Sequence, residues 1–380
     1  MVHPEFHSQT EIEEHLRSRG SLAGAVLVSL DLRRLTGLLL ATDLRGALFL
    51  GCRLAAEAIE VALNRGALVF PPIDDIPFDA YRTRLYRPEE LMSGYRVGEE
   101  ASYEETLDGR IYQHYVDTGS TAPESILVTL TRRLHDHAIT DALHDFIEGQ
   151  QVVAIMGGHS IERGEPDYRA VARVARRLAR RGFLMTSGGG PGSMEATHLG
   201  ACFAHREEAE LSAAIDDLAA APHFHPLGPW LDAAFEVLAR YSFGDAGDRP
   251  ISLGIPTWHY GHEPPTPFAT HIAKYFLNSV REDGLLAIAK HGVVFTRGSA
   301  GTLQEVFQDA AQNHYKTMKV VSPMVFLGKQ FWLAERPAFP LLQRLARGKE
   351  YERWLAVTDA VDAVVETVER YAAAASCRKG

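Results

Sequence analysis

Two glycine-rich stretches carry the residues best suited to chemistry. The first reads SGGGPGSME at 187–195, and the second reads RGSAGTLQE at 297–305. Each follows a short apolar run and precedes a helical pattern, so each predicts a strand, a glycine turn and a helix start. A helix start presents unpaired N–H groups and the positive end of the helix dipole, which together bind anions. The predicted phosphate ligands are Gly188, Gly189, Gly190 and Gly192 in the first stretch, and Gly298, Ser299, Gly301 and Thr302 in the second.

A third glycine turn, MGGHS at 156–160, adds Gly158 and Ser160 to this candidate site. Any one of these loops alone is equally consistent with a tight turn that binds nothing. Several of them in one sheet favour a phosphate-bearing ligand. Their spacing matches neither the G-x-G-x-x-G of dinucleotide folds nor the GxxxxGK[ST] of P-loop nucleotide hydrolases.

The two main stretches also resemble a known family. GGGPGSMEA (188–196) followed by RGSAGTLQE is similar to the paired motifs GGGxxGxM and PGGxGTxxE of the LONELY GUY-like family. The resemblance covers roughly residues 150–375. It implies a Rossmann-like fold, hydrolysis of the N-glycosidic bond of nucleoside 5′-monophosphates without a cofactor, and at least a homodimer. It also brings Met194 and Arg297 into the predicted nucleotide site.

Some positions depart from the family pattern. Arg297 stands where the motif has proline, and Ser299 stands where it has a second glycine. Arg281, within NSVRED (278–283), is close to the register of the family's arginine-lysine pair without matching it. These departures indicate a divergent subgroup and keep a second function open, a non-catalytic sensor that binds a nucleotide in the same cleft. A decarboxylase, the third possibility, would need a Schiff-base lysine for pyridoxal phosphate.

The proposed reaction assigns roles to particular side chains. Cleavage of the C1′–N bond builds positive charge on the ribose, so the site needs a carboxylate near C1′. Glu305, one helical turn after Thr302, is the predicted carboxylate, and capping of its own helix is the alternative. Arg281 would clamp the phosphate or steady the leaving base, or would only pair with a neighbouring carboxylate. Glu195 would assist water or ribose, or would only complement a helix dipole.

No metal site is predicted. The histidines of HFH (223–225) and HYGHE (259–263) lack the i, i+4 spacing of a zinc-binding helix. The loop at 256–265 instead predicts a wall for the base, formed by Trp258 and Tyr260. The arginines between 169 and 181 predict a solvated helix face and not an RNA site.

These residues require a parallel sheet to bring them together. QVVAIMGG (151–158), a helical stripe at 168–182 and FLMTSGGG (183–190) predict one strand-helix-strand unit. Further strands are expected at 250–258, 291–298, 319–328 and 354–359, with helices at 268–290, 301–315, 330–346 and 360–374. The acidic stretch 205–249 is expected to be a helical insertion. The pattern predicts an α/β, Rossmann-like, doubly wound parallel sheet with its site at the carboxyl ends of the strands.

An additional N-terminal α/β domain of unknown role is expected at 1–120, before the nucleotide-binding domain at 121–380. Its strands are predicted within 23–32, 46–52 and 66–72, with a helix at 55–66. Leu39, Leu44, Phe49 and Leu54 recur every five residues, which we interpret as coincidence and not as a repeat. Residues 73–122 read as a surface connector.

Composition limits the partners and the compartment. The chain of 380 residues has a net charge of −10, which argues against nucleic acid and anionic membrane surfaces as partners. Its three cysteines are far apart and fit a reducing compartment. The sequence offers no transmembrane run and no signal peptide, so we expect a cytoplasmic protein with a nucleoside monophosphate as substrate.

Overall fold

The computed structural model describes residues 3–243, 249–260 and 264–376. The chain divides into two compact units. The small unit contains residues 1–84 and 122–142, and the large unit contains residues 85–121 and 143–380. The boundary expected near residue 120 thus falls where the chain passes from the large unit back to the small one. Helix α6 (Ile126–Ile147) then runs from the small unit into the large unit.

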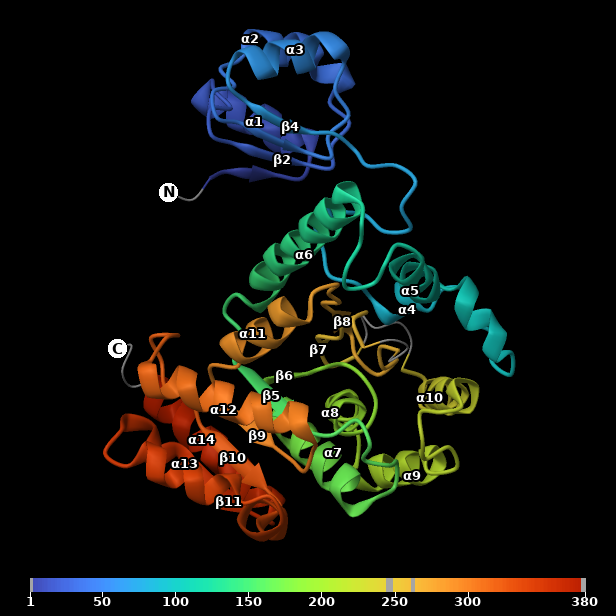
Figure 1. Ribbon diagram of the computed structural model, residues 1–380, viewed down its shortest axis with the longest axis vertical. Helices are drawn as coiled ribbons and strands as arrows, with labels where there is room; N and C mark the ends of the chain where they lie inside the picture. The colour runs from blue at the N-terminus through green and yellow to red at the C-terminus, as the bar shows by residue number, and fades with distance from the viewer. Residues whose placement is uncertain (1–2, 244–248, 261–263, 377–380) are drawn as a thin grey trace. The chain divides into compact units, whose positions relative to one another are not determined.

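The large unit is built on a seven-stranded sheet in the order β11-β10-β9-β5-β6-β7-β8, and all neighbouring strands are parallel (Figure 1). The strands are β5 (Val152–Met156), β6 (Leu184–Ser187), β7 (Ser252–Gly254), β8 (His271–Ile272), β9 (Val293–Phe295), β10 (Met324–Leu327) and β11 (Leu355–Thr358). The order reverses between β5 and β9. The predicted α/β, doubly wound parallel sheet is therefore confirmed.

Helices cover both faces of this sheet. Helices α7, α8 and α14 pack together on one face with α9 and α10 beside them, and α11, α12 and α13 lie on the other (Figure 1). Their bounds are α7 (Pro166–Ala179), α8 (Ser193–Cys202), α9 (Glu208–Leu218), α10 (Leu227–Arg240), α11 (Asn278–Ile288), α12 (Ala300–Tyr315), α13 (Ala338–Ala346) and α14 (Val361–Ser376). Short turns η4 (Phe331–Glu335) and η5 (Glu350–Trp354) precede α13 and β11.

Two predicted segments differ from the structure. The helix expected at 268–290 was wrong in its first part, which contains strand β8, because these residues are almost all buried at the sheet edge. The expected connector contributes α4 (Pro88–Leu91), η2 (Glu100–Glu105) and α5 (Leu107–Asp117) to the large unit, and Tyr86 pairs with Ile272 of β8. The insertion at 205–249 is helical as predicted in its described part, which holds α9 and α10.

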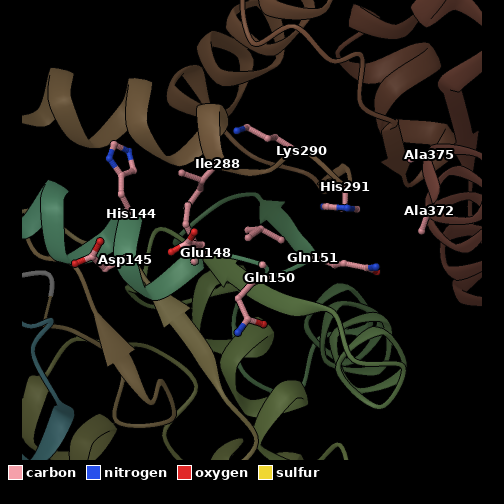
Figure 2. A pocket seen from close by; sticks show the side chains of 13 residues that line it. His144, Asp145, Glu148, Gln150, Gln151, Ile288, Lys290, His291, Ala372 and Ala375 are labelled. Carbon is pink, nitrogen blue, oxygen red and sulfur yellow. The ribbon is translucent and has the colours of Figure 1, made fainter. Parts of the chain in front are cut away.

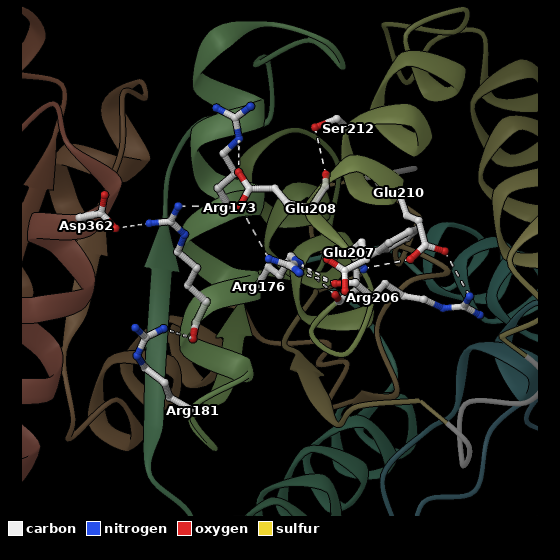
Figure 3. A network of polar contacts seen from close by, with 11 residues as sticks. Arg173, Arg176, Arg181, Arg206, Glu207, Glu208, Glu210, Ser212 and Asp362 are labelled. Atoms are coloured by element: carbon white, nitrogen blue, oxygen red, sulfur yellow. Dashed lines mark hydrogen bonds and ion pairs between the residues drawn. The ribbon is translucent and has the colours of Figure 1, made fainter.

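The arginine-rich face of α7 is paired with acids and not simply solvated. Arg173 lies 3.3 Å from Glu208 of α9 (Figure 3). Arg181, just after α7, lies 2.6 Å from Glu369 of α14. Arg176 is only 5% exposed and donates hydrogen bonds to the carbonyls that follow α8. This face therefore ties α7 to its neighbouring helices, because Arg169, Arg173 and Arg177 each lie against a carboxylate of another helix.

The small unit is a four-stranded parallel sheet in the order β1-β2-β3-β4. Its elements are β1 (Glu5–Phe6), α1 (Gln9–Arg19), β2 (Val26–Val28), η1 (Arg33–Leu35), α2 (Thr36–Ala41), β3 (Leu48–Leu50), α3 (Ala56–Asn64) and β4 (Leu68–Phe70). Helix α1 begins with a capping box between Ser8 and Glu11 and ends at Gly20, which has a φ of 67°. Its core combines Phe6, Leu27 and Phe49 of the strands with leucines and alanines of the helices and turns.

A repeat of 20 to 22 residues underlies this small sheet. Val26 pairs with Leu48, and Leu48 pairs with Leu68. Gly24, Gly46 and Gly66 precede the three strands at equivalent positions, with φ values of 70°, 66° and 80°. Each is followed by a buried alanine, Ala25, Ala47 or Ala67. The five-residue recurrence of apolar side chains comes from successive core positions within this longer repeat.

Among the described helices, none combines the length and the apolar character needed to cross a membrane.

Candidate functional site

The three predicted glycine turns meet at the point where the strand order reverses. The N–H of Gly158, after β5, donates to the carbonyl of Arg297, after β9, at 3.0 Å. The N–H of Ser193, at the start of α8, donates to the carbonyl of Gly158 at 3.2 Å. A Cβ on residue 158 would lie 3.3 Å from the Cα of Gly298. The turns therefore pack backbone against backbone at the usual ligand position of a doubly wound sheet.

The first glycine loop is closely packed. Gly188, Gly189, Gly190 and Gly192 are all buried. A Cβ on residue 188 would overlap the guanidinium of Arg281, and one on residue 189 would lie 3.0 Å from the Cα of Gly254. Gly192 has a φ of 69° and lies against the carbonyl of Gly158. These glycines are needed for close packing and for the geometry of the turn. Their burial does not support the expectation that their N–H groups form an open phosphate site.

The second loop is the accessible one. Ser299 and Gly301 are exposed, and a Cβ on residue 301 would meet no atom within 4 Å. Residue 298 must be glycine because the hydroxyl of the buried Thr302 occupies the space that a Cβ would take. Helix α12 starts here and runs for 16 residues. The start of α12 is therefore accessible at Ser299 and Gly301, and the first-turn N–H groups and dipole of a helix start suit an anion.

Arg281 and Glu305 lie together beside this helix start. Arg281, on α11, donates from Nε to the carbonyl of Ile255 at 2.9 Å. Its Nη1 lies 3.7 Å from Oε1 of Glu305, on α12, and the two side chains are only 11% and 14% exposed. The structure thus brings together two of the three predicted catalytic residues, although sequence register alone left Arg281 ambiguous.

The Glu305 carboxyl has an unusual proton affinity. Burial raises its pKa from the ordinary value of 4.5 to about 7, Arg281 opposes the rise, and Glu282 adds to it. A carboxyl with a pKa near neutral pH populates both protonation states there. It can therefore accept or donate a proton or, when ionised, face developing positive charge.

Glu195 lies elsewhere. It is fully buried, and its carboxylate accepts hydrogen bonds from Arg163 Nε at 2.8 Å and from the Tyr168 hydroxyl at 3.0 Å. Arg163 also donates to the carbonyl of Trp230 at 3.0 Å. The structure gives Glu195 an internal ion pair and does not bring it to Arg281 and Glu305. The sequence placed Glu195 correctly in the first turn of α8. It gave no sign of the pairing with Arg163, which is 32 residues away in the chain.

Arg297 also points to protein partners. Its guanidinium pairs with Glu165 and lies 2.6 Å from Asp167, both at the start of α7. Burial together with the nearby charge of Glu335 raises the pKa of Asp167. Arg297 therefore bridges two loops, where the family motif has a proline that could form no such bridge.

Residues expected around the base are dispersed. Trp258 is fully buried and donates from Nε1 to Asp108 at 2.9 Å, so it cannot stack on a ligand. Tyr260 is 55% exposed and accepts a hydrogen bond from Asn278 at 2.8 Å. Ser160 is exposed near Gly158, and Met194 is partly exposed against Gly188.

Metal ligands do not gather in the part of the chain that the structure describes, which contains no cluster of three or more histidine, cysteine or carboxylate side chains suited to a metal ion. Residues 261–263 of the HYGHE stretch lie outside that part.

Sequence reasoning missed two groups of buried polar residues. Ser187, His198 and Ser252 form a hydrogen-bonded chain at the base of the first loop. Asp309, one turn after Glu305 on α12, is 2% exposed, and burial raises its pKa to about 8. The first group could have been suspected only from a histidine four residues after Met194, and the second only from a carboxylate within the apolar stripe of α12.

A pocket of about 620 Å³ lies at the amino ends of the strands, around the start of β5 (Figure 2). His144, Glu148, Gln151, Lys290 and His291 line it with apolar residues of α11 and α14. Its position at the amino end of β5 separates it from the glycine loops at the carboxyl end. Figure 2 shows several of its polar side chains directed away from one another, so the pocket has no convergent set of ligands.

Solved structures with a similar chain path include the molybdenum cofactor carrier protein of Chlamydomonas reinhardtii, with 15% identity, a TM-score of 0.37 and coverage of 59% of this chain and 99% of that one. The molybdenum cofactor binding protein of Rippkaea orientalis gives 12% identity, a TM-score of 0.35 and coverage of 58% and 96%. No protein-family model matches the sequence, and a search of curated proteins finds no significant match.

Proposed function

We propose that this protein hydrolyses the N-glycosidic bond of a nucleoside 5′-monophosphate, releasing the free base and ribose 5-phosphate. The observation that carries the proposal is the close pair of Arg281 and Glu305 beside the open start of α12. An anion site and a carboxyl of near-neutral pKa then lie within one helical turn of each other. The motif resemblance to LONELY GUY-like proteins supports the same reaction.

The proposed mechanism divides the work between these elements. The N–H groups at Ser299 to Thr302 hold the 5′-phosphate, because the first turn of α12 has free donors and a positive dipole end. Ionised Glu305 faces C1′ and stabilises the positive charge that grows as the C1′–N bond breaks. Water supplies the hydroxyl to C1′ and a proton to the base. Arg281 keeps Glu305 partly ionised and offers its remaining N–H groups to the substrate.

The test is a panel of AMP, CMP, GMP, UMP and IMP, with free base detected by mass spectrometry. We expect release from at least one nucleotide and little from the matching nucleoside, which lacks the phosphate. Glu305→Gln should abolish release, and Glu366→Gln, an exposed control on α14, should not change it. Absence of base from every nucleotide would refute the enzyme assignment.

A nucleotide sensor is the second candidate. The observation that favours it is the close packing of the first glycine loop against Arg281, which limits the space at this side of the pair. Calorimetry separates the two functions. Binding of a nucleoside monophosphate without any base release would support the sensor, and turnover would support the hydrolase.

A further inference from the structure

A chain of hydrogen bonds runs beneath the first glycine loop. His198, on α8, lies between two serines: its Nε2 is 2.9 Å from Oγ of Ser187, at the end of β6, and its Nδ1 is 3.0 Å from Oγ of Ser252, at the start of β7. All three residues are completely buried. The chain therefore joins two neighbouring strands to the helix that follows the loop.

The burial of this chain determines its chemistry. Burial lowers the pKa of His198 to about 3, so its imidazole is neutral, with one nitrogen donating and the other accepting. A serine beside a histidine can act as a nucleophile, but a substrate atom cannot reach a completely buried hydroxyl. The arrangement instead holds its members in fixed positions, as satisfied buried polar networks do.

Ser187 connects this chain to the Arg281–Glu305 pair. Its Oγ accepts from the N–H of Gly189 at 3.1 Å, and its carbonyl accepts from the N–H of Ile255 at 2.9 Å. The carbonyl of Ile255 accepts from Nε of Arg281 at 2.9 Å. Arg281 in turn lies against Gly188 and faces Glu305. An unbroken series of contacts thus leads from His198 to the carboxyl of Glu305.

We propose that Ser187 and His198 are positioning residues that hold Arg281 against Glu305. Their effect on catalysis rests on the proposed hydrolase function, and their effect on the geometry of the pair does not. Loss of the His198–Ser187 bond would free the turn at Ser187 and Gly189, and the carbonyl of Ile255 would no longer hold Arg281 in place. Arg281 would then stabilise ionised Glu305 less well.

The structure provides a matched pair of substitutions. The amide of glutamine can replace Nε2 of histidine, so His198→Gln keeps a partner for Ser187. The shorter amide of asparagine replaces Nδ1, so His198→Asn keeps a partner only for Ser252. Ser187→Ala removes the hydroxyl itself. Leu199→Ala, a completely buried neighbour on α8, reports on loss of packing alone.

The primary measurement is the titration of Glu305 followed by NMR of carboxyl-labelled protein, which needs no substrate. Two charges shift the pKa of Glu305, those of Arg281 and Glu282 on α11. The elements α13 and η5 also pack on α12, but no charged group of their described residues contributes to this shift. We expect an upward shift in His198→Asn and Ser187→Ala, and values close to wild type in His198→Gln and Leu199→Ala. Equal titration in all four variants would overturn the proposal.

Kinetics then test the catalytic consequence. In the nucleotide panel, His198→Asn and Ser187→Ala should lower kcat about tenfold or more with little change in KM, since α12 still holds the phosphate. The rising limb of the pH profile should move to higher pH in these variants, in step with the Glu305 titration. If wild-type protein releases no base, the hydrolase assignment fails, and the NMR titration still decides the positioning role.

Discussion

Nη1 of Arg281 lies 3.7 Å from the carboxylate of Glu305, close enough for attraction but beyond hydrogen-bonding distance. Arg281 donates a hydrogen bond from Nε to the backbone carbonyl of Ile255 instead. The guanidinium is thus anchored by the loop after β7 and not by its acidic partner. The Nη groups of Arg281 and the carboxylate oxygens of Glu305 can therefore still form hydrogen bonds to a ligand.

The pH dependence of stability provides a first test of Glu305. Its pKa in the folded protein, about 7, lies above the ordinary value of 4.5, so the folded state binds more protons between these values. The free energy of unfolding should therefore fall as the pH rises from about 4.5 through 7. Glu305→Gln should remove this penalty and raise stability at pH 8 by up to about 3 kcal/mol, with little change at pH 4. Thermal unfolding of both proteins from pH 4 to pH 9 measures the difference, and parallel curves would contradict the assignment.

Asp309 should show the same sign at higher pH. Its Oδ2 is buried without a partner among the described residues, and burial places its pKa at about 8, above the ordinary 3.8. Asp309→Asn should stabilise the protein progressively as the pH rises towards 9, because the neutral amide avoids a buried charge. The exposed control Glu366→Gln should have little effect at any pH. Destabilisation by Asp309→Asn at pH 9 would show that the ionised carboxylate has a favourable partner.

Two glycines of the second loop distinguish packing from binding. Gly298→Ala should destabilise the protein, since the added Cβ would overlap the hydroxyl of Thr302. Gly301→Ala meets no atom and lies in a helix, so it should preserve or slightly raise the melting temperature. If the 5′-phosphate binds at this helix start, Gly301→Ala should nevertheless weaken nucleotide binding about tenfold. Calorimetry with unchanged affinity would place the phosphate elsewhere.

Glu195 should behave as a structural residue. Glu195→Gln leaves the buried Arg163 without its counter-charge and should cost about 3–5 kcal/mol of unfolding free energy. Replacing both residues, as Arg163→Met with Glu195→Leu, should recover much of that loss because no buried charge remains. Chemical denaturation measures all three proteins. A fully stable Glu195→Gln with reduced kcat would restore the catalytic role considered from the sequence.

The small unit offers a test of its repeat. Gly46 has a φ of 66° and an added Cβ would touch nothing within 4 Å, so Gly46→Ala should cost about 1–2 kcal/mol through backbone strain alone. Gly37, in α2, also has open space but ordinary helical geometry. Gly37→Ala should therefore stabilise the protein by about 0.4–1 kcal/mol. Equal effects at the two positions would remove the basis for the repeat.

The location of the candidate site was predictable from sequence because glycine is demanded by local contacts. At Gly158, Gly192 and Gly298 the backbone lies against another loop or against Thr302, so an added Cβ would crowd its neighbours. The glycines therefore stand at recognisable positions in the sequence. Short apolar runs likewise predicted the large sheet, since its inner strands, from β10 to β7, are buried on both faces.

Other features depend on contacts distant in sequence. The pairing of Glu195 with Arg163 and the burial of Trp258 against Asp108 arise only after folding, so neighbouring residues give no sign of them. Strand β8 has just two residues, too few for a periodicity. In the small unit, helices of different lengths separate Gly24, Gly46 and Gly66, and a search for a five-residue period could not find their longer spacing.

The equivalence of those three glycines gives the small sheet a modular construction. Each module of 20 to 22 residues contains the same glycine turn, the same buried alanine and one strand, and that strand pairs with the strand of the next module. Duplication of residues 44–63 would extend the sheet by one strand and preserve every existing pairing. An insertion of half that length would break the correspondence between successive turns, so the unit can change its size only in whole steps.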